Sequence, residues 1–190
     1  RMAELKALSQ DVLKNSSDIA NYNSKFKNLQ VQLYQISQET FNGVSLFATK
    51  VTGGGSDGVF GGTEAQDNTV SIYTTEAGAS GSVVSLNKGM LLSALTFSSS
   101  DAKTNLAYGA SNAKTLSATA SSSAVSLSTL SVSFFTQAIE NVATLRAENG
   151  GAVSRLQFAL DAANRSKSTL EAANGRIMDV DIAEESTRLA

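Results

Sequence analysis

The side chains that could do chemistry in this sequence are carboxylates, lysines, tyrosines and hydroxyls, because its 190 residues include no Cys and no His. Their absence excludes disulfides, thiolate nucleophiles, imidazole acid–base catalysis and the commonest zinc ligands. The formal net charge of −2 gives no electrostatic reason to expect nucleic acid or an anionic membrane as a partner. No run of residues approaches the ~20 apolar residues of a membrane span. We therefore expect no enzyme activity, no cofactor and no metal.

Four carboxylates lie close together near the end of the sequence, at Asp179, Asp181, Glu184 and Glu185. A divalent cation is one interpretation, but the group lacks the Gly and the ligand spacing of an EF-hand loop. The interpretation we favour is a solvated helix start, with Asp181 as the N-cap and Glu184 at the third helical position.

Residues 51–66, VTGGGSDGVFGGTEAQ, form a glycine-rich segment. Such segments can cradle phosphate with their backbone N–H groups, but a phosphate loop also needs a Lys-Ser or Lys-Thr pair and a strand–helix setting. Neither is present, so we expect a surface loop.

The elements that position these residues are predicted from the spacing of apolar side chains. Residues 1–14 carry a helical stripe, and Ser17 or Asp18 can cap a second helix that continues to about residue 40. The two stripes consist of Met2, Leu5, Leu8 and Val12, and of Ile19, Tyr22, Phe26, Leu29, Leu33 and Ile36.

The second helix is predicted to stop at Phe41-Asn42-Gly43. Asn42 and Gly43 tolerate positive φ, so they can end the helix or reverse the chain, and Phe41 is expected to pack back on the preceding turn. Beyond them Val44 and Leu46 alternate with polar residues, which indicates a strand.

The middle of the chain contains β-type patterns. Residues 69–75 and 82–86 are predicted strands, 90–97 are predicted as a strand or a short helix, and 124–132 as a last strand. Residues 98–123 show no clear period.

A long third helix is predicted after Ser133, a fair N-cap. Gly150 and Gly151 interrupt its pattern and favour a kink or the close approach of another backbone. We expect its apolar stripe, like that of the second helix, to form the core rather than an interface, with less burial at the far end, where Lys167 and Asn174 fall in the stripe. The stripe consists of Phe135, Ile139, Val142, Leu145, Val153, Leu156, Leu160, Ala163, Leu170 and Ile177.

The expected fold class is mainly α with a β-rich insertion. Two N-terminal helices and one long C-terminal helix form an elongated antiparallel helical bundle, capped by a variable β/loop lobe. The helical rod comprises residues 1–43 and 133–190, and the lobe comprises 44–132.

Three stretches closely resemble bacterial flagellin: RMAELKALSQ at 1–10, ISQETFNGVSLF at 36–47, and FTQAIENVATLRAENGGAVSRLQFALDAANRSKSTLEAANGRIMDVDIAEESTRLA at 135–190. The resemblance implies a secreted structural subunit that assembles with other flagellin subunits into the extracellular filament used for motility. It also implies a flagellar export chaperone and hook-associated proteins as partners. The terminal helices that form the inner tube of the filament look absent, so we expect this fragment to be monomeric and not to polymerise.

The resemblance also suggests site residues. Some flagellins contact a Toll-like innate receptor through an Arg, a Leu and a Glu, and Arg1 and Leu5 match the first two. Lys25 stands in place of the Glu and Ala3 in place of another usual Arg, so we expect weak or no receptor recognition. Flagellins carry sugars on the outer lobe, which makes Ser98, Ser99, Ser100, Ser121, Ser122 and Ser123 candidate glycosylation sites.

Two alternatives remain. One is a hook–filament junction protein, although DVDIAEE and FNGVSLF favour the filament protein. The other is a flagellin-like surface protein with a glycan-binding or adhesive lobe. Sugar sites usually place exposed aromatic rings beside polar groups, and the lobe offers Tyr73, Tyr108, Phe60 and Phe97.

Overall fold

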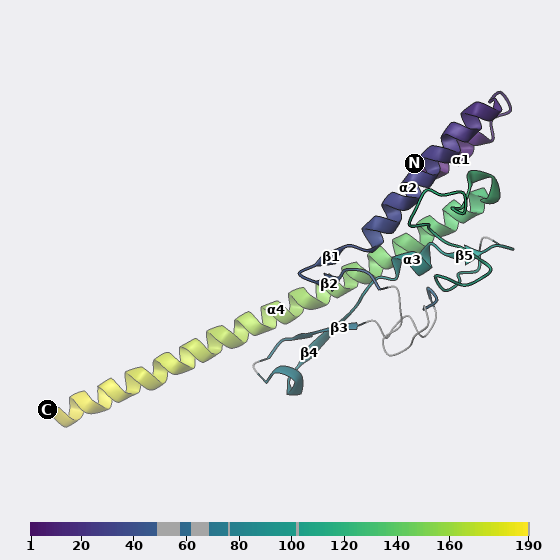
Figure 1. The fold of residues 1–190 in the computed structure, drawn as a ribbon. Helices are drawn as coiled ribbons and strands as arrows, with labels where there is room; N and C mark the ends of the chain where they lie inside the picture. Colours follow the sequence, from purple (N-terminus) through teal and green to yellow (C-terminus); the bar gives the residue numbers. More distant parts are fainter. Residues whose placement is uncertain (49–57, 62–68, 76, 102, 190) are drawn as a thin grey trace. The chain divides into compact units, whose positions relative to one another are not determined.

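A computed structural model describes residues 1–48, 58–61, 69–75, 77–101 and 103–189 of the chain. The described residues are mainly helical, and the strands pair only as β1–β2, β3–β4 and β5–β6 (Figure 1). The helices are α1 (Met2–Ser9), α2 (Ser16–Ser37), α3 (Leu91–Ala94) and α4 (Val132–Leu189), with 3-10 turns η2 (Gly78–Ser80) and η3 (Leu127–Thr129). The strands are β1 (Thr40–Phe41), β2 (Val44–Ser45), β3 (Thr69–Tyr73), β4 (Val83–Asn87), β5 (Phe97–Ser98) and β6 (Ala113–Lys114). The expected fold class, mainly α with a long C-terminal helix and small β elements, is confirmed.

The chain divides into two compact units. The first comprises Arg1–Val70 and Asn87–Asn149, and the second comprises Ser71–Leu86 and Gly150–Ala190. Helix α4 contributes its first turns to the first unit and the remainder to the second.

The first unit begins with the pair α1 and α2. Helix α1 ends at Ser9, earlier than the pattern predicted, and leaves Val12 96% exposed. Helix α2 begins after Asn15, whose side chain accepts a 2.8 Å hydrogen bond from the backbone N–H of Asp18. Asn15 is therefore the N-cap, and the prediction of Ser17 or Asp18 was wrong because a cap must lie outside the first turn.

The core of the first unit joins these two helices to α3, β5 and the start of α4. Leu5 and Phe26 are 2% and 1% exposed. The ring of Phe26 meets that of Phe135 edge to face at 6.2 Å, and Phe97 meets Phe134 at 4.9 Å. The central residue of the predicted α2 stripe is thus core, whereas Ile19 and Ile36 at its two ends are exposed.

The Phe-Asn-Gly stretch forms a tight hairpin. Asn42 and Gly43 have φ of 50° and 78°, and Phe41 pairs with Val44 across the turn. Two left-handed residues between two strands make a turn whose twist matches that of the strands. Because α2 has already ended at Ser37, Asn-Gly reverses the chain rather than capping the helix. Phe41 is 75% exposed, so its expected packing on the preceding turn was wrong.

The predicted strands in the middle are confirmed in part. In β3 and β4 half-buried residues alternate with exposed ones, and residues 91–94 form the short helix that was one of two predictions for 90–97. Residues 124–132 are not a strand, because Leu127 and Leu130 are both buried three residues apart, a spacing that the turn η3 provides.

Helix α4 is continuous from Val132 to Leu189. It passes through Gly150 and Gly151, where an added Cβ would find no atom within 4 Å. The expected close approach of another backbone is therefore wrong. Asp181 lies inside the helix, so its predicted role as an N-cap is wrong as well.

Candidate functional site

The second unit exposes a row of apolar side chains on α4, which we call the α4 stripe: Val153, Leu160, Leu170 and Ile177. Their exposed fractions are 47%, 60%, 68% and 70%. The sequence pattern predicted these residues as core, but in the described chain they are exposed. The spacing of apolar residues defines which side chains share one face of the helix, but it does not show which other segment packs on that face. An amphipathic helix with an uncovered apolar face can bind another helix.

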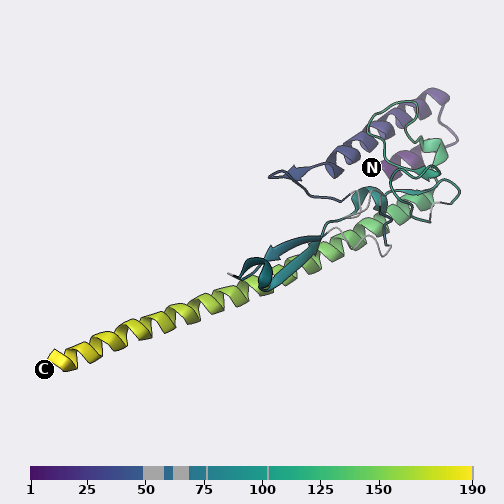
Figure 2. The same ribbon diagram turned by 60° about the horizontal axis from the view of Figure 1, so that its bottom comes forward.

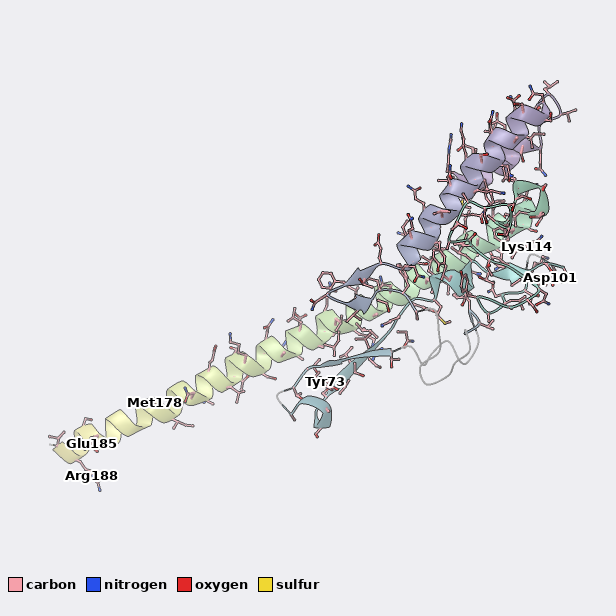
Figure 3. All side chains as sticks on the ribbon, viewed as in Figure 1. Tyr73, Asp101, Lys114, Met178, Glu185 and Arg188 are labelled. Carbon is pink, nitrogen blue, oxygen red and sulfur yellow. The ribbon has the colours of Figure 1, made fainter. Side chains whose placement is uncertain are left out.

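Sequence reasoning missed two further exposed apolar side chains on the same helix, Phe158 at 74% and Met178 at 64%. Figure 3 labels Met178 on α4. They lie outside the predicted stripe, so periodicity alone gave no signal for them. They add exposed apolar surface to α4 outside the α4 stripe.

The β-strands of the second unit lie beside α4, as Figures 1 and 2 both show. The guanidinium of Arg155 donates a 3.3 Å hydrogen bond to the backbone carbonyl of Ser85. Leu156 is only half-exposed, and the helix beyond it, from residue 161 to 178, is exposed throughout.

The first unit carries an apolar groove of about 490 Å³ between α1, α2 and α4. Its apolar wall includes Met2, Leu33, Ile36, Phe135, Ile139 and Val142. The charged residues among those that line it are Arg1 and Arg146. Such a groove can accept apolar side chains of a partner that carries acidic groups at its edge.

The receptor-type residues lie in different environments. Arg1 is exposed and forms a 2.6 Å ion pair with Glu4, and it lines a second groove, of about 410 Å³, together with Lys25. Leu5 is 2% exposed and belongs to the core. Arg1 and Lys25 therefore line the same groove, whereas Leu5 is almost completely buried at its wall. Receptor contact stays a prediction.

The candidate glycosylation serines form two separate groups. Ser98 is buried and its hydroxyl lies 2.8 Å from that of exposed Ser100. Ser98, Ser99 and Ser100 line a polar pocket of about 150 Å³ with Asp101 and Lys114. Figure 3 labels the last two of these residues. The other group lies apart in the sequence and is partly to fully exposed: Ser121, Ser122 and Ser123. Glycosylation stays a prediction.

Asp101, which lines this pocket, has a lowered pKa. The backbone N–H of Thr104 donates to its carboxylate at 2.7 Å, the N–H of Lys103 at 3.0 Å and the Thr104 hydroxyl at 3.0 Å. These hydrogen bonds favour the charged form and lower the pKa of Asp101. Both carboxylate oxygens thus accept hydrogen bonds from its own turn.

Residues 121–127 are held by a set of side chains that we call the backbone clasp: Lys6, Asn23, Lys27 and Gln30. Lys6 donates to the carbonyl of Leu127 at 2.9 Å, Lys27 to that of Ser121 at 2.9 Å and Gln30 to that of Val125 at 2.6 Å. Asn23 accepts from the N–H of Leu127 at 2.9 Å. Lys27 and Gln30 lie outside the predicted apolar stripe of α2, so the sequence pattern did not indicate this role.

Two further classes of site find no support among the described residues. No group of three or more acidic side chains could hold a metal ion; the side chains of Asp179, Asp181 and Glu184 lie outside the described part, as does most of the glycine-rich segment 51–66. No described helix is both long and apolar enough to span a membrane.

The comparisons with known proteins single out α4. Residues 132–190 match the family described as the bacterial flagellin C-terminal helical region. Nothing matches among the curated proteins or among the solved structures. The matched residues cover all of α4, from the aromatic residues in the core to the exposed stripe. Over this helix the chain is similar to the C-terminal helical region of bacterial flagellin.

Proposed function

We propose that the chain is a structural subunit of the bacterial flagellar filament, exported to the cell exterior and assembled with further copies for motility. The observation that carries this proposal is the match over residues 132–190. Its partners are other flagellin subunits, an export chaperone and hook-associated proteins. Residues 1–43 and 133–190 are the proposed rod, and 44–132 the proposed outer lobe.

The α4 stripe supports a role in assembly. A helix gains most of its stability in proteins from packing of its apolar face, yet Leu160, Leu170 and Ile177 are at least 60% exposed. Packing against a further chain segment would bury these residues. The abundance of Ser, Thr and Gly and the absence of His and Cys fit a structural rather than a catalytic role.

The test is immunogold electron microscopy of the source bacterium with antibodies raised against the 190-residue chain. Label along the whole filament supports the proposal. Label confined to the junction between hook and filament indicates the junction protein, and label on the cell body indicates a surface protein. Either of these two patterns overturns the filament assignment.

A genetic control separates assembly from mere attachment. Deletion of the gene that encodes the chain is expected to remove filaments and swimming, and the restored gene is expected to return both. Sedimentation of the purified 190-residue chain checks the monomeric state expected for it.

A further inference from the structure

The sequence contains the dipeptide Asn-Gly three times, in two kinds of backbone. Asn42-Gly43 forms the turn between β1 and β2, with φ of 50° and 78°. Asn149-Gly150 and Asn174-Gly175 both lie inside α4. All three asparagines are exposed, so an Asn side-chain amide is accessible to solvent both in a hairpin turn and in a helix.

We propose that Asn42 is a site of spontaneous deamidation, and that the two helical Asn-Gly sites are protected. The backbone nitrogen of Gly43 loses its proton to solvent base and attacks the side-chain carbonyl carbon of Asn42. The bond from that carbon to the amide nitrogen breaks, and ammonia leaves. Water then opens the resulting succinimide ring at one of its two carbonyls, which yields aspartate or isoaspartate.

The hairpin leaves the reacting groups accessible. Each strand of the pair has two residues, and Phe41 and Val44 beside the turn are 75% and 52% exposed. Within the described part of the chain, the Asn42 amide has no hydrogen-bond partner that would hold it away from the backbone. The left-handed turn must open for the attack, and a small two-stranded ribbon opens easily.

The helix opposes the same reaction. In an α-helix the N–H of residue i donates to the carbonyl of residue i−4, which occupies the nitrogens of Gly150 and Gly175. Attack there requires several consecutive hydrogen bonds of α4 to break first. Glycine without a Cβ offers no steric protection at any of the three sites, so the difference comes from the backbone.

The modification would change the hairpin. Aspartate keeps a side chain that tolerates positive φ but adds a negative charge near Glu39. Isoaspartate inserts an extra carbon into the main chain between residues 42 and 43. The two-residue turn then cannot keep Phe41 opposite Val44, and the exposed apolar side chains of the hairpin are displaced.

The experiment incubates the intact 190-residue chain in mildly alkaline buffer and follows all three sites in the same sample by peptide mass spectrometry. An isoaspartyl methyltransferase identifies the isoaspartate product. We expect Asn42 to convert about tenfold faster than Asn149 and Asn174, since local opening controls the rate. Equal rates, or a faster rate at either helical site, overturn the proposal.

Two controls make the comparison specific. In concentrated urea the three sites share one dipeptide and no fold, so their rates are expected to converge; a persistent difference there would assign the effect to neighbouring residues and overturn the role of the backbone. Asn42→Gly keeps a residue that accepts positive φ and removes the amide, so it is expected to abolish the fast product. The inference does not depend on the proposed function.

Discussion

The side-chain amide of Asn141 on α4 donates a 2.8 Å hydrogen bond to the backbone carbonyl of Ala94, the last residue of α3. The same nitrogen donates to the side-chain oxygen of Asn105 at 3.0 Å. Asn141 is 5% exposed. One buried amide therefore connects the start of the long helix to the end of α3 and to Asn105.

Replacement Asn141→Ala is expected to lower the free energy of unfolding by about 1–3 kcal/mol, because the carbonyl of Ala94 stays buried without its donor. Chemical denaturation followed by far-UV circular dichroism measures the change. Asn164→Ala is the matched control, since Asn164 is exposed on the same helix. A loss as large in the control as in Asn141→Ala would show that the buried hydrogen bonds do not matter.

Replacement Phe26→Ala is expected to cost about 3–5 kcal/mol, because it leaves a cavity beside Phe135 in the core. Phe158→Ala removes the same ring from a position that is 74% exposed and is expected to change stability by less than about 0.5 kcal/mol. Urea denaturation of both variants makes the comparison. Equal losses would contradict the assignment of Phe26 to the core and Phe158 to the surface.

Phe26 and Phe158 also show which parts of this fold the sequence pattern predicts and which it does not. Periodicity predicted α2 and α4 and placed Phe26 in the core correctly, because helical spacing defines which side chains share a face. It could not predict that the α4 stripe stays exposed, because burial depends on what packs against the face. Phe158 lies off the stripe and gave no pattern at all.

Local turns were harder to predict than long helices. Asn42-Gly43 was identified as a chain reversal or a helix stop, and the structure selects the reversal because α2 ends at Ser37. The Ser-rich stretch before α4 alternates loosely, a pattern that predicts a strand, whereas Leu127 and Leu130 need a turn to reach the same core. The backbone clasp involves contacts between residues about 100 positions apart, which no local pattern encodes.

Replacements Gly150→Ala and Gly151→Ala are expected to stabilise α4 by about 1 kcal/mol each, because an added Cβ meets no atom within 4 Å and alanine is the better helix former. Thermal unfolding and the helical circular dichroism signal report the gain. Gly43→Ala serves as the opposite control: its φ of 78° strains any Cβ, so this variant is expected to lose stability. A loss in the helical variants would mean that those glycines serve a contact with another chain.

The pKa of Asp101 is expected to lie below its usual value of 3.8. Its hydrogen bonds stabilise the fold at pH values above the unfolded pKa, and that stability is lost as the pH falls through the lowered pKa of the folded state. Titration of the side-chain carboxyl carbon by NMR measures the value. Thr104→Val removes the hydroxyl donor and is expected to raise the pKa toward 3.8, whereas Thr119→Val leaves it unchanged. A pKa at or above 3.8 in the unsubstituted chain would contradict the observed turn.

The backbone clasp holds residues 121–127 through their main-chain atoms and makes no hydrogen bond to their side chains. Its hydrogen bonds end on main-chain atoms of Ser121, Val125 and Leu127, so the path of the chain is fixed while the outward residues are free to differ. Ser122 and Ser123 are exposed within this path. The side chains of this short stretch can therefore be replaced by those of a foreign peptide, which the protein would then display in a fixed conformation.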